Sequence, residues 1–369
     1  MIPYIMPAKQ NDSSKYQKLS DIEHVLHAPD TYIGSIEPDE IYGWIFLKNM
    51  ITYKQYNHIS GLYKIFDEAL VNSRDHVIRM KQKKESGEDC FEVKNISVDI
   101  QEDGTITIMN DGDGIDVIEH DVHKLWIPEM IFAHLRTSTN YTKGEKKLVG
   151  GKNGFGVKLL FIYSSWGELE TVDHRRGLKY KQTFENNLGT INKPKITKCK
   201  SKPYTKVTFK PDFKRFKQKK ITKDMLSVMI RRVYDIAAVT DKTVKVKLNG
   251  TLLNIRNYES YMNLYIGDKS TTPRVFEVGN DRWEYGVCIS PLDEFTHVSS
   301  VNGISTTKGG GTHVQYILNQ IVRKVIAVIE KKKKVKVKPT TVKEQLMVFV
   351  NCLVENPAFD SQTKDTLNT

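Results

Sequence analysis

The stretch GLYKIFDEALVNSRDHVIRMKQKK, residues 61–84, carries the clearest secondary-structure signal in this chain. Its apolar residues recur at intervals of three and four, the spacing that places side chains on one face of an α-helix. They are Leu62, Ile65, Phe66, Ala69, Leu70 and Val77. The pattern predicts a long amphipathic helix whose apolar face packs against a core.

A row of polar residues borders this stripe. At about 100° per residue, Glu68, Asn72, Asp75 and Arg79 lie on one face of the predicted helix. Glu68 and Asn72 are one turn apart, so a carboxylate can act as general base for a water while an amide oxygen binds a hard cation such as Mg²⁺. Taken alone, the row is better explained as a solvated helix face with a contact between Glu68 and Asn72.

A second signal follows the helix. The segments ISVDI (96–100) and TITIM (105–109) alternate apolar and polar residues on either side of a turn, which predicts a hairpin. After Asn110 comes Asp111 in a tight glycine turn, where its carboxylate can accept a hydrogen bond from an exocyclic amine such as that of adenine. Composition alone favours an ordinary β-turn, and the glycine position argues against a calcium-binding EF-hand loop.

The glycine-rich stretch LVGGKNGFGVKLL spans residues 148–160. It lacks the lysine spacing of a Walker loop, and Gly151, Gly154 and Gly156 have the reverse spacing of the dinucleotide fingerprint. A helix that begins near Gly156 and runs through VKLLFIYSSW can still bind an anion at its N-terminus, with added charge from Lys158. Taken singly, such loops are weak evidence for a phosphate site.

The whole chain sets the limits of these interpretations. It has 369 residues, 39% hydrophobic and 27% charged, which is typical of a soluble globular protein with two domains. No apolar run is long enough to span a bilayer, and no signal peptide is recognisable. The four cysteines are widely separated, so neither a disulfide framework nor a zinc site is expected. A formal charge of +12 favours nucleic acid as a partner.

The last third of the chain looks like a separate α/β unit. HVSSVNG (297–303) is strand-like and leads through a glycine-rich segment to a long helix that opens at Thr312, with Gln315 three residues on, a capping-box pattern. LMVFVNCLV (346–354) then reads as a buried strand or the start of a helix. We expect a strand–helix–strand unit, with the domain boundary near Asn249–Gly250 and domains of 1–249 and 250–369.

A lysine run lies between that helix and the last segment. It consists of Lys331, Lys332, Lys333, Lys334, Lys336 and Lys338. The run can be a solvated helix end, which the helix dipole favours, or a contact with DNA phosphates. No aromatic residue interleaves it, so base stacking and sequence reading are not expected. We favour a DNA contact.

The three motifs become specific in combination: E-x-x-x-N on a helix, D-G-x-G after a strand and G-G-x-N-G-x-G before a helix. Together with TSTNY (137–141), TTKGGGTHVQYI (306–317) and DSQTK (360–364), they make the chain resemble the ATPase region of type IIA DNA topoisomerases of the eukaryotic type, within the GHKL ATPases. The resemblance implies an α/β (α+β) fold: a GHKL (Bergerat) α/β sandwich with an N-terminal dimerisation arm, followed by a ribosomal-S5-domain-2-like α/β transducer domain.

The resemblance also implies residue roles. Glu68 is expected to activate the hydrolytic water, Asn72 to bind Mg²⁺, Asp111 to bind the adenine amine, and Lys364 to contact the γ-phosphate. Tyr16 matches an arm residue that reaches the partner's nucleotide. The other expected ATP contacts are Ser138, Thr139, Asn140, Gly151, Lys152, Asn153, Gly154, Phe155, Gly156, Val157, Lys158, Gln362 and Thr363.

The implied function is the ATP-driven gate of a type II topoisomerase. ATP and Mg²⁺ are the expected cofactors, and double-stranded DNA, a second copy of the chain and a DNA-cleavage core are the expected partners. No segment resembles that core, so the chain alone is expected to hydrolyse ATP without cutting DNA. An intracellular location is expected: the nucleus for a eukaryotic source, or the host nucleus or a cytoplasmic virus factory for a viral one.

Other functions use the same fold or the same charge. Chaperones and mismatch-repair proteins are GHKL ATPases, but they are not expected to carry DSQTK after such a transducer pattern. A histidine kinase needs a phosphoacceptor domain that is not recognisable here. A DNA-binding regulator that does not hydrolyse ATP is the alternative from another class. Asp113 and Asp116 depart from the family pattern, which more often has a basic residue and proline there, and the sequence offers no reason for this acidic turn.

Overall fold

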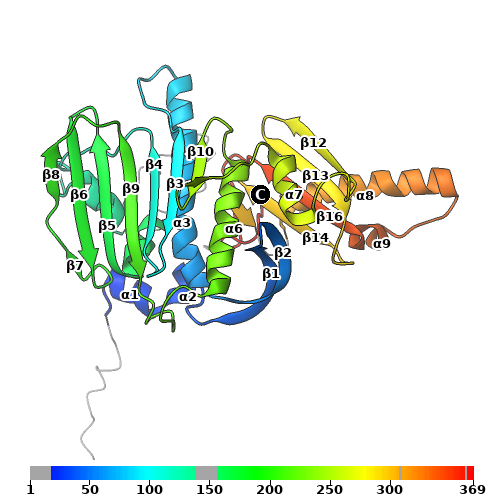
Figure 1. Cartoon of the computed structure of the whole chain (residues 1–369), viewed down its shortest axis with the longest axis horizontal. Coiled ribbons are helices and arrows are strands. Elements are labelled where there is room, and N and C mark those ends of the chain that lie inside the picture. Colours follow the sequence, from blue (N-terminus) through cyan, green and yellow to red (C-terminus); the bar gives the residue numbers. More distant parts are fainter. Residues whose placement is uncertain (1–17, 136, 138–155, 307–309, 362–363) are drawn as a thin grey trace, which may run out of the picture.

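The computed structural model describes residues 18–135, 137, 156–306, 310–361 and 364–369, and contains two large β-sheets with helices packed on each (Figure 1). The larger sheet lies in the N-terminal part of the chain, and the smaller sheet follows it. This confirms the predicted α/β fold class.

The first sheet has nine strands in the order β11-β10-β3-β4-β9-β5-β6-β7, with β8 paired to β6. The predicted hairpin is present as the antiparallel pair β3 and β4, and β10 joins β3 in parallel. The strands are β3 (Asn95–Ile100), β4 (Ile106–Asp111), β5 (Ser164–Asp173), β6 (Leu178–Glu185), β7 (Thr190–Ile191), β8 (Lys195–Lys198), β9 (Tyr204–Pro211), β10 (Lys245–Leu248) and β11 (Thr251–Leu252).

Helices cover one face of this sheet and share its core. The predicted amphipathic helix is α3, which buries its apolar stripe against the sheet and its neighbouring helices. Its neighbours include α5, which begins at the last glycine of the glycine-rich stretch, and α6. The helices of this part are α1 (Asp21–His27), α2 (Pro29–Tyr32), α3 (Ser60–Glu85), α4 (Ile127–Ala133), α5 (Gly156–Ile162) and α6 (Lys223–Val239).

A two-stranded hairpin connects α2 to α3 in the chain. It is formed by β1 (Asp39–Leu47) and β2 (Met50–His58), which pair along their whole length. In Figure 1 the hairpin lies below the smaller sheet and beside α6. Trp44 and Phe46 of β1 contribute to a core that also contains residues of the C-terminal part, so the hairpin belongs to the junction of the two sheets.

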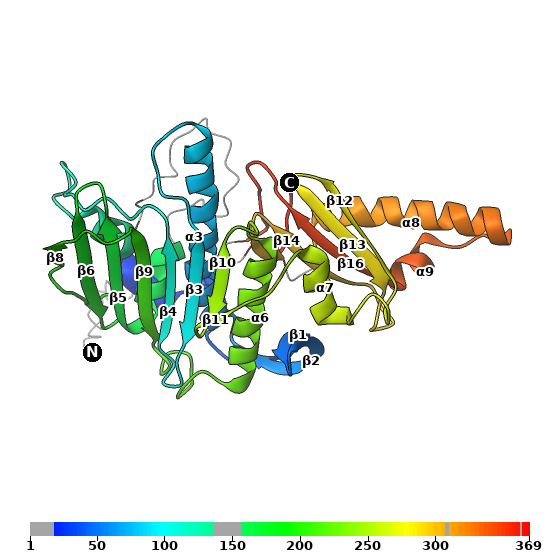
Figure 2. The ribbon, with the colours of Figure 1, turned by 45° about the horizontal axis from the view of Figure 1, so that its top comes forward.

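The second sheet has five strands in the order β12-β13-β16-β14-β15. The predicted strand–helix–strand unit is present, because β14 and β16 are parallel and α8 lies between them in the chain. In both views α8 projects beyond the strands, away from the first sheet (Figure 1 and Figure 2). The elements are α7 (Tyr258–Ile266), β12 (Arg274–Asn280), β13 (Trp283–Ile289), β14 (Thr296–Val301), β15 (Ile304–Thr306), α8 (Thr312–Lys333), α9 (Pro339–Glu344) and β16 (Leu346–Cys352).

Some local expectations are wrong. The predicted capping box at Thr312 is absent, because Gly311 is the N-cap and the Thr312 hydroxyl donates to the backbone of the C-terminal segment at Leu367 instead. The helix that begins at Gly156 ends at Ile162, and the residues from Ser164 onward extend as β5. In each case a tertiary contact or strand pairing overrides the local sequence preference.

The predicted domain boundary at Asn249–Gly250 falls in the tight turn between β10 and β11, and both of these strands pair in the first sheet. The two-domain division itself stays a prediction. None of the helices built from the described residues is both long and apolar enough to cross a membrane.

Candidate active site

Glu68 lies in the first half of α3 and is buried, with 6% of its surface exposed. Its carboxylate pairs with Lys64 one turn earlier, at 2.7 Å between Nζ and Oε1, and Lys64 is itself 4% exposed. A solvated helix face, the simpler reading of the sequence, is therefore wrong for this residue. Burial of both groups in one pair gives the carboxylate a defined position.

A second lysine reaches the same carboxylate from the far end of the chain. Lys364 Nζ lies 3.6 Å from Glu68 Oε1, and the Lys364 side chain is mostly buried. The segment that carries Lys364 is closed by a hydrogen bond from Asp360 N to Thr366 O. The structure thus brings together Glu68 and Lys364, the two residues expected to act in catalysis, from opposite ends of the sequence.

These contacts set the charge state of Glu68. Burial alone raises the pKa of the carboxyl group, but the ammonium groups of Lys364 and Lys64 outweigh it and lower the pKa to about 2. Glu68 is therefore ionised at neutral pH. While both lysines are in place, it is also a weak acceptor for a proton.

Gly156, the first residue of α5, lies against this carboxylate. A Cβ atom built on Gly156 meets Glu68 Oε2 at 1.9 Å, so no larger residue fits without displacing Glu68. The last glycine of the glycine-rich stretch is thus required by the packing of Glu68. This role was not evident from the glycine spacing.

Asn72 lies one turn after Glu68 and is half-buried. Its Nδ2 donates to the backbone oxygen of Glu68 at 2.7 Å, which leaves the amide oxygen as the group that can bind a cation. In the described part of the chain, no group of three or more His, Cys, Asp or Glu side chains is arranged to hold a metal ion. One amide oxygen beside bound phosphates fits Mg²⁺, which keeps several waters and takes few protein ligands.

The expected role of Asp111 conflicts with its contacts. Its Oδ1 accepts from the backbone nitrogens of Lys94 and Asn95 at 2.6 and 2.8 Å, and its Oδ2 accepts from Asn95 Nδ2 at 2.7 Å. These bonds hold the carboxylate at the start of β3. Because side chains alternate along a strand, Asp111 lies on the opposite face of β4 from Asn110, which is buried with Ile108 on the helix-covered face.

Lys158 follows Gly156 on α5 and is buried. Its Nζ donates to the backbone oxygen of Thr137 at 2.6 Å, and burial lowers the pKa of this lysine to about 8. Val157 lies beside it and packs against the core. The remaining predicted ATP contacts lie outside the described residues: Tyr16, Ser138, Thr139, Asn140, Gly151, Lys152, Asn153, Gly154, Phe155, Gln362 and Thr363.

The acidic turn after β4, which the sequence left unexplained, holds neighbouring segments in place through hydrogen bonds. Asp113 accepts from Phe91 N at 2.8 Å and from Arg175 at 3.3 Å. Asp116 accepts from Arg176 Nη1 at 2.6 Å. The two carboxylates therefore bind the turn that joins β5 to β6, and their unusual charge is balanced by two arginines.

The lysine run lies at the far end of α8, and all six of its lysines are exposed. The predicted loop is only partly a loop, because Lys331, Lys332 and Lys333 form the last turn of α8. Lys334 adopts a left-handed conformation at the helix end, and the rest lead to α9. Three positive charges in the last turn also complement the helix dipole.

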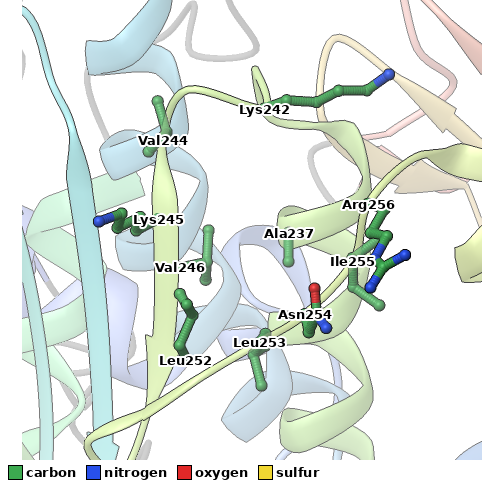
Figure 3. Close-up of a pocket in the computed structure, with 10 residues that line it drawn as sticks. All are labelled: Ala237, Lys242, Val244, Lys245, Val246, Leu252, Leu253, Asn254, Ile255 and Arg256. Atoms are coloured by element: carbon green, nitrogen blue, oxygen red, sulfur yellow. The ribbon is translucent and has the colours of Figure 1, made fainter.

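A cavity of about 210 Å³ lies elsewhere, between α6, β10 and residues 252–256 (Figure 3). It is lined by Ala237, Lys242, Val244, Lys245, Val246, Leu252, Leu253, Asn254, Ile255 and Arg256. None of the predicted site residues is among them, and the volume is below that of a typical pocket for a cofactor, about 300–1,000 Å³. The candidate active site is therefore the cluster around Glu68.

Sequence reasoning missed three residues of this region. Lys64 stands four residues before Glu68, a spacing that pairs side chains on a helix. Asn110 precedes the glycine turn and could have been found by counting the alternation along β4. Arg232 lies within the apolar pattern of α6 and is fully buried, and a cation inside such a pattern is itself a signal.

Comparisons with known sequences agree over nearly the whole chain. The profile of the DNA gyrase B family matches residues 252–369. A DNA topoisomerase 2 of Meyerozyma guilliermondii is 46% identical over 387 residues, covering 98% of this chain and 27% of that protein. A DNA topoisomerase 2 of Acanthamoeba polyphaga mimivirus is 43% identical over 364 residues, covering 96% of this chain and 28% of that protein. The chain spans about a quarter of the length of these curated relatives.

Solved structures match the chain along most of their own length as well. The ATPase region of Saccharomyces cerevisiae topoisomerase II, bound to ICRF-187 (dexrazoxane), gives a TM-score of 0.88 at 45% identity, covering 97% of this chain and 91% of that one. The ATPase and transducer domains of DNA topoisomerase II from Balamuthia mandrillaris give 0.88 at 39% identity, covering 98% and 90%. The similarity thus extends through both sheets.

Proposed function

Because the chain belongs to the ATPase regions of the type II DNA topoisomerases, we propose that it binds ATP on the helix-covered face of the first sheet and hydrolyses it with Glu68 as general base. The observation that carries this proposal is the buried Glu68 carboxylate held between Lys64 and Lys364. A carboxylate buried on a helix, with one cation from its own helix and one from the far end of the chain, is suited to sense a ligand charge.

The two lysines suggest how the base is switched on. With both cations beside it, Glu68 has a pKa of about 2 and accepts a proton poorly. A γ-phosphate competes for Lys364, and loss of one cation raises the pKa of Glu68. Glu68 then takes a proton from water as the water oxygen bonds to the γ-phosphorus. The bond from that phosphorus to the β–γ bridging oxygen breaks, giving ADP and phosphate.

Other residues position the nucleotide in this proposal. The Asn72 amide oxygen would hold Mg²⁺, which when bound neutralises phosphate charge. Asn110 replaces Asp111 as the candidate for the adenine amine, since it lies on the helix-covered face and an amide can both accept and donate. The remaining contacts stay as expected from the family: Tyr16, Ser138, Thr139, Asn140, residues 151–158, Gln362 and Thr363.

The whole enzyme's activity is a further part of the proposal. ATP binding closes two copies of the chain into a dimer that captures a double-stranded DNA segment, and hydrolysis reopens it. Strand passage needs a DNA-cleavage core in addition to this chain. The exposed lysine run at the end of α8 is the proposed DNA contact, and the location is intracellular. Residues 1–249 and 250–369 are the proposed domains.

The test is ATP hydrolysis by the Glu68→Ala variant. We expect phosphate release to fall by about 10²–10⁴-fold, the contribution of a general base, while binding of a non-hydrolysable ATP analogue persists. Glu170→Gln is a matched control. Glu170 is also buried and also paired with two lysines, Lys179 and Lys206, but it lies on β5 and not on α3. Equal activity of Glu68→Ala and the wild type contradicts the assignment.

A DNA-binding regulator that keeps the fold without hydrolysis is the second candidate. Phosphate release by the wild type, measured with and without DNA, separates the two functions. Light scattering with the non-hydrolysable analogue tests dimerisation separately.

A further inference from the structure

Among the described residues, two polar links between α3 and the C-terminal part of the chain lie side by side, and one of them is the Lys364–Glu68 pair. The other is one residue away in the chain, at Asp67. Arg232 of α6 donates from Nε to Asp67 Oδ1 at 2.6 Å and from Nη2 to the backbone oxygen of Gly303 at 2.7 Å. Gly303 lies in the turn between β14 and β15, so a single side chain joins α3, α6 and the second sheet.

This second contact is fully enclosed. Arg232 is 0% exposed, and Asp67 is also buried. Gly303 has a φ of +79°, and a Cβ there meets Cδ and Nε of Arg74 on α3 at 2.8 and 2.9 Å. The β14–β15 turn therefore fits between two arginines, and only a glycine permits that approach.

The turn is also tied firmly to the rest of the second sheet. Asn302 donates from its backbone to Cys352 O and from its side chain to Val354 O, and its Oδ1 accepts from Val354 N at 2.8 Å. Cys352 is the last residue of β16, and the chain runs from there to Lys364. Arg232 is thus linked, through Gly303 and Asn302 of the β14–β15 turn, to the end of β16, from which the chain runs on to Lys364.

The two contacts differ in strength. The Arg232–Asp67 pair is short and charge-assisted, and Arg232 continues to a backbone acceptor. The Lys364–Glu68 pair is longer, at 3.6 Å, and Glu68 has Lys64 as another partner. A ligand that competes for Lys364 breaks the weaker contact and leaves the stronger one in place.

We propose that Arg232 is a positioning residue for ATP hydrolysis: it anchors the second sheet to α3 beside Glu68, and the segment carrying Lys364 moves about this anchor between Glu68 and the γ-phosphate. The inference rests on the proposed function of Glu68 and Lys364. It adds a nucleotide-independent anchor to the nucleotide-dependent contact. Without the anchor, Lys364 has no fixed distance from the reacting phosphate.

The test uses the double variant Asp67→Asn/Arg232→Met, which removes both charges together and so avoids leaving one buried charge unpaired. We expect kcat to fall by about 10²-fold, the loss expected from a misplacement of about 1 Å, with the Kd for a non-hydrolysable ATP analogue unchanged. The matched control is Asp235→Asn/Arg231→Met. Arg231 is the neighbouring arginine of α6, and neither its ion pair with Asp235 nor its hydrogen bond to the backbone of Trp44 involves a residue of α3. The control therefore removes an equivalent buried pair and is expected to keep the wild-type kcat.

A merely structural role is separated by adding Lys364→Met to each background. If Arg232 acts through Lys364, removing Lys364 costs much less kcat in the Asp67→Asn/Arg232→Met background than in the wild type, because the two effects are coupled. Losses that multiply independently, or a double variant with the wild-type kcat, overturn the proposal. If the double variant does not fold, Arg232→Lys is used in the same kcat measurements. A lysine keeps the charge but cannot reach Asp67 and Gly303 together.

A readout without hydrolysis keeps the two proposals apart. Fluorophores at Ser86, after α3, and at Lys333, at the end of α8, report the orientation of the second sheet, and both positions are exposed. The analogue is expected to shift energy transfer in the wild type, whereas the double variant gives one broad distribution with or without it. A wild type that shifts but does not hydrolyse ATP contradicts the proposed function alone. A double variant that shifts like an active wild type contradicts the anchor alone.

Discussion

Lysines occur in two contrasting settings in this protein. Lys64, Lys158 and Lys364 are buried or mostly buried, and each has one defined partner atom within reach. The six lysines of the run at the end of α8 are exposed to solvent. Buried lysines therefore lower the pKa of the Glu68 carboxylate, the proposed base, in one region, and exposed lysines supply a diffuse positive charge in the other.

The difference is one of dielectric environment. A cation near a buried carboxylate shifts its pKa strongly, because little water screens the pair. An exposed cation interacts over about a Debye length and weakens with salt. Buried lysines should thus affect turnover with little salt dependence, and exposed lysines should affect DNA affinity with a steep one.

Among the lysines, the largest effect on turnover is expected for Lys364→Met. We predict a fall in kcat of about 10²–10³-fold, comparable to the loss of one preorganised donor in the transition state. Single-turnover phosphate release measures it, with Lys333→Met as the exposed control. A loss of equal size in that control would remove the distinction between the two settings.

Lys64→Met should have a smaller effect with a distinct pH signature. Because Lys64 fixes the position of the Glu68 carboxylate, its loss is expected to lower kcat by about tenfold, even though it also raises the pKa of the base. In this variant the pKa of Glu68 rises from about 2 toward its usual range. The ionised carboxylate stabilises the fold at neutral pH, and this stabilisation is lost as the pH falls through the folded pKa. The variant therefore loses it at a higher pH than the wild type. Acid unfolding curves of both proteins test this, and identical acid midpoints contradict it.

Lys158 should give a few-fold effect that appears only in alkali. Burial lowers its pKa to about 8, so the cation is present below that pH and lost above it. We predict that nucleotide affinity declines as pH rises past about 8 to 9 in the wild type, and that Lys158→Arg, which stays charged, removes the decline. Calorimetric titration at pH 7 and 9.5 measures both. A parallel decline in the arginine variant assigns the effect to another group.

The smallest effect on turnover is expected for the exposed run. Replacing all six lysines with glutamine should leave DNA-free kcat and thermal stability unchanged, because exposed substitutions rarely alter stability by more than about 0.5 kcal/mol. The log–log salt slope of DNA affinity should instead become less steep by up to about 5, if all six contact phosphates. An unchanged slope would leave the run as a solvated helix end.

Periodicity was sufficient to predict much of this fold. The stripe of α3, the β3–β4 hairpin and the strand–helix–strand order of β14, α8 and β16 follow from local patterns. The family membership predicted from the ordered motifs is confirmed by the solved structures. The capping box at Thr312 failed because the hydroxyl donates to the backbone oxygens of Leu367 and Thr369, 55 and 57 residues away. Local rules cannot include a competitor that only tertiary structure supplies.

The candidate site shows the same limit more sharply. Glu68 and Asn72 could be placed on one helix face from spacing, but one of the two cations beside Glu68, Lys364, comes from far along the chain. Asp111 was predicted to bind the adenine amine because it opens the glycine turn and matches the family motif, yet strand alternation turns its carboxylate away from the helices. The motif therefore predicted Asp111, whereas the geometry of the strand favours the neighbouring residue, Asn110.

The contact between Gly156 and Glu68 restricts how this site can change by mutation. An alanine at position 156 needs space that the Glu68 carboxylate occupies, at 1.9 Å from the new atom. Shortening Glu68 to aspartate would clear that space, but it also withdraws the base from its lysines. Each change is expected to be harmful without the other. The combination also lacks the glutamate side chain at position 68, which reaches the two lysines. Glu68 and Gly156 therefore constrain each other, and neither position is expected to tolerate a change by itself.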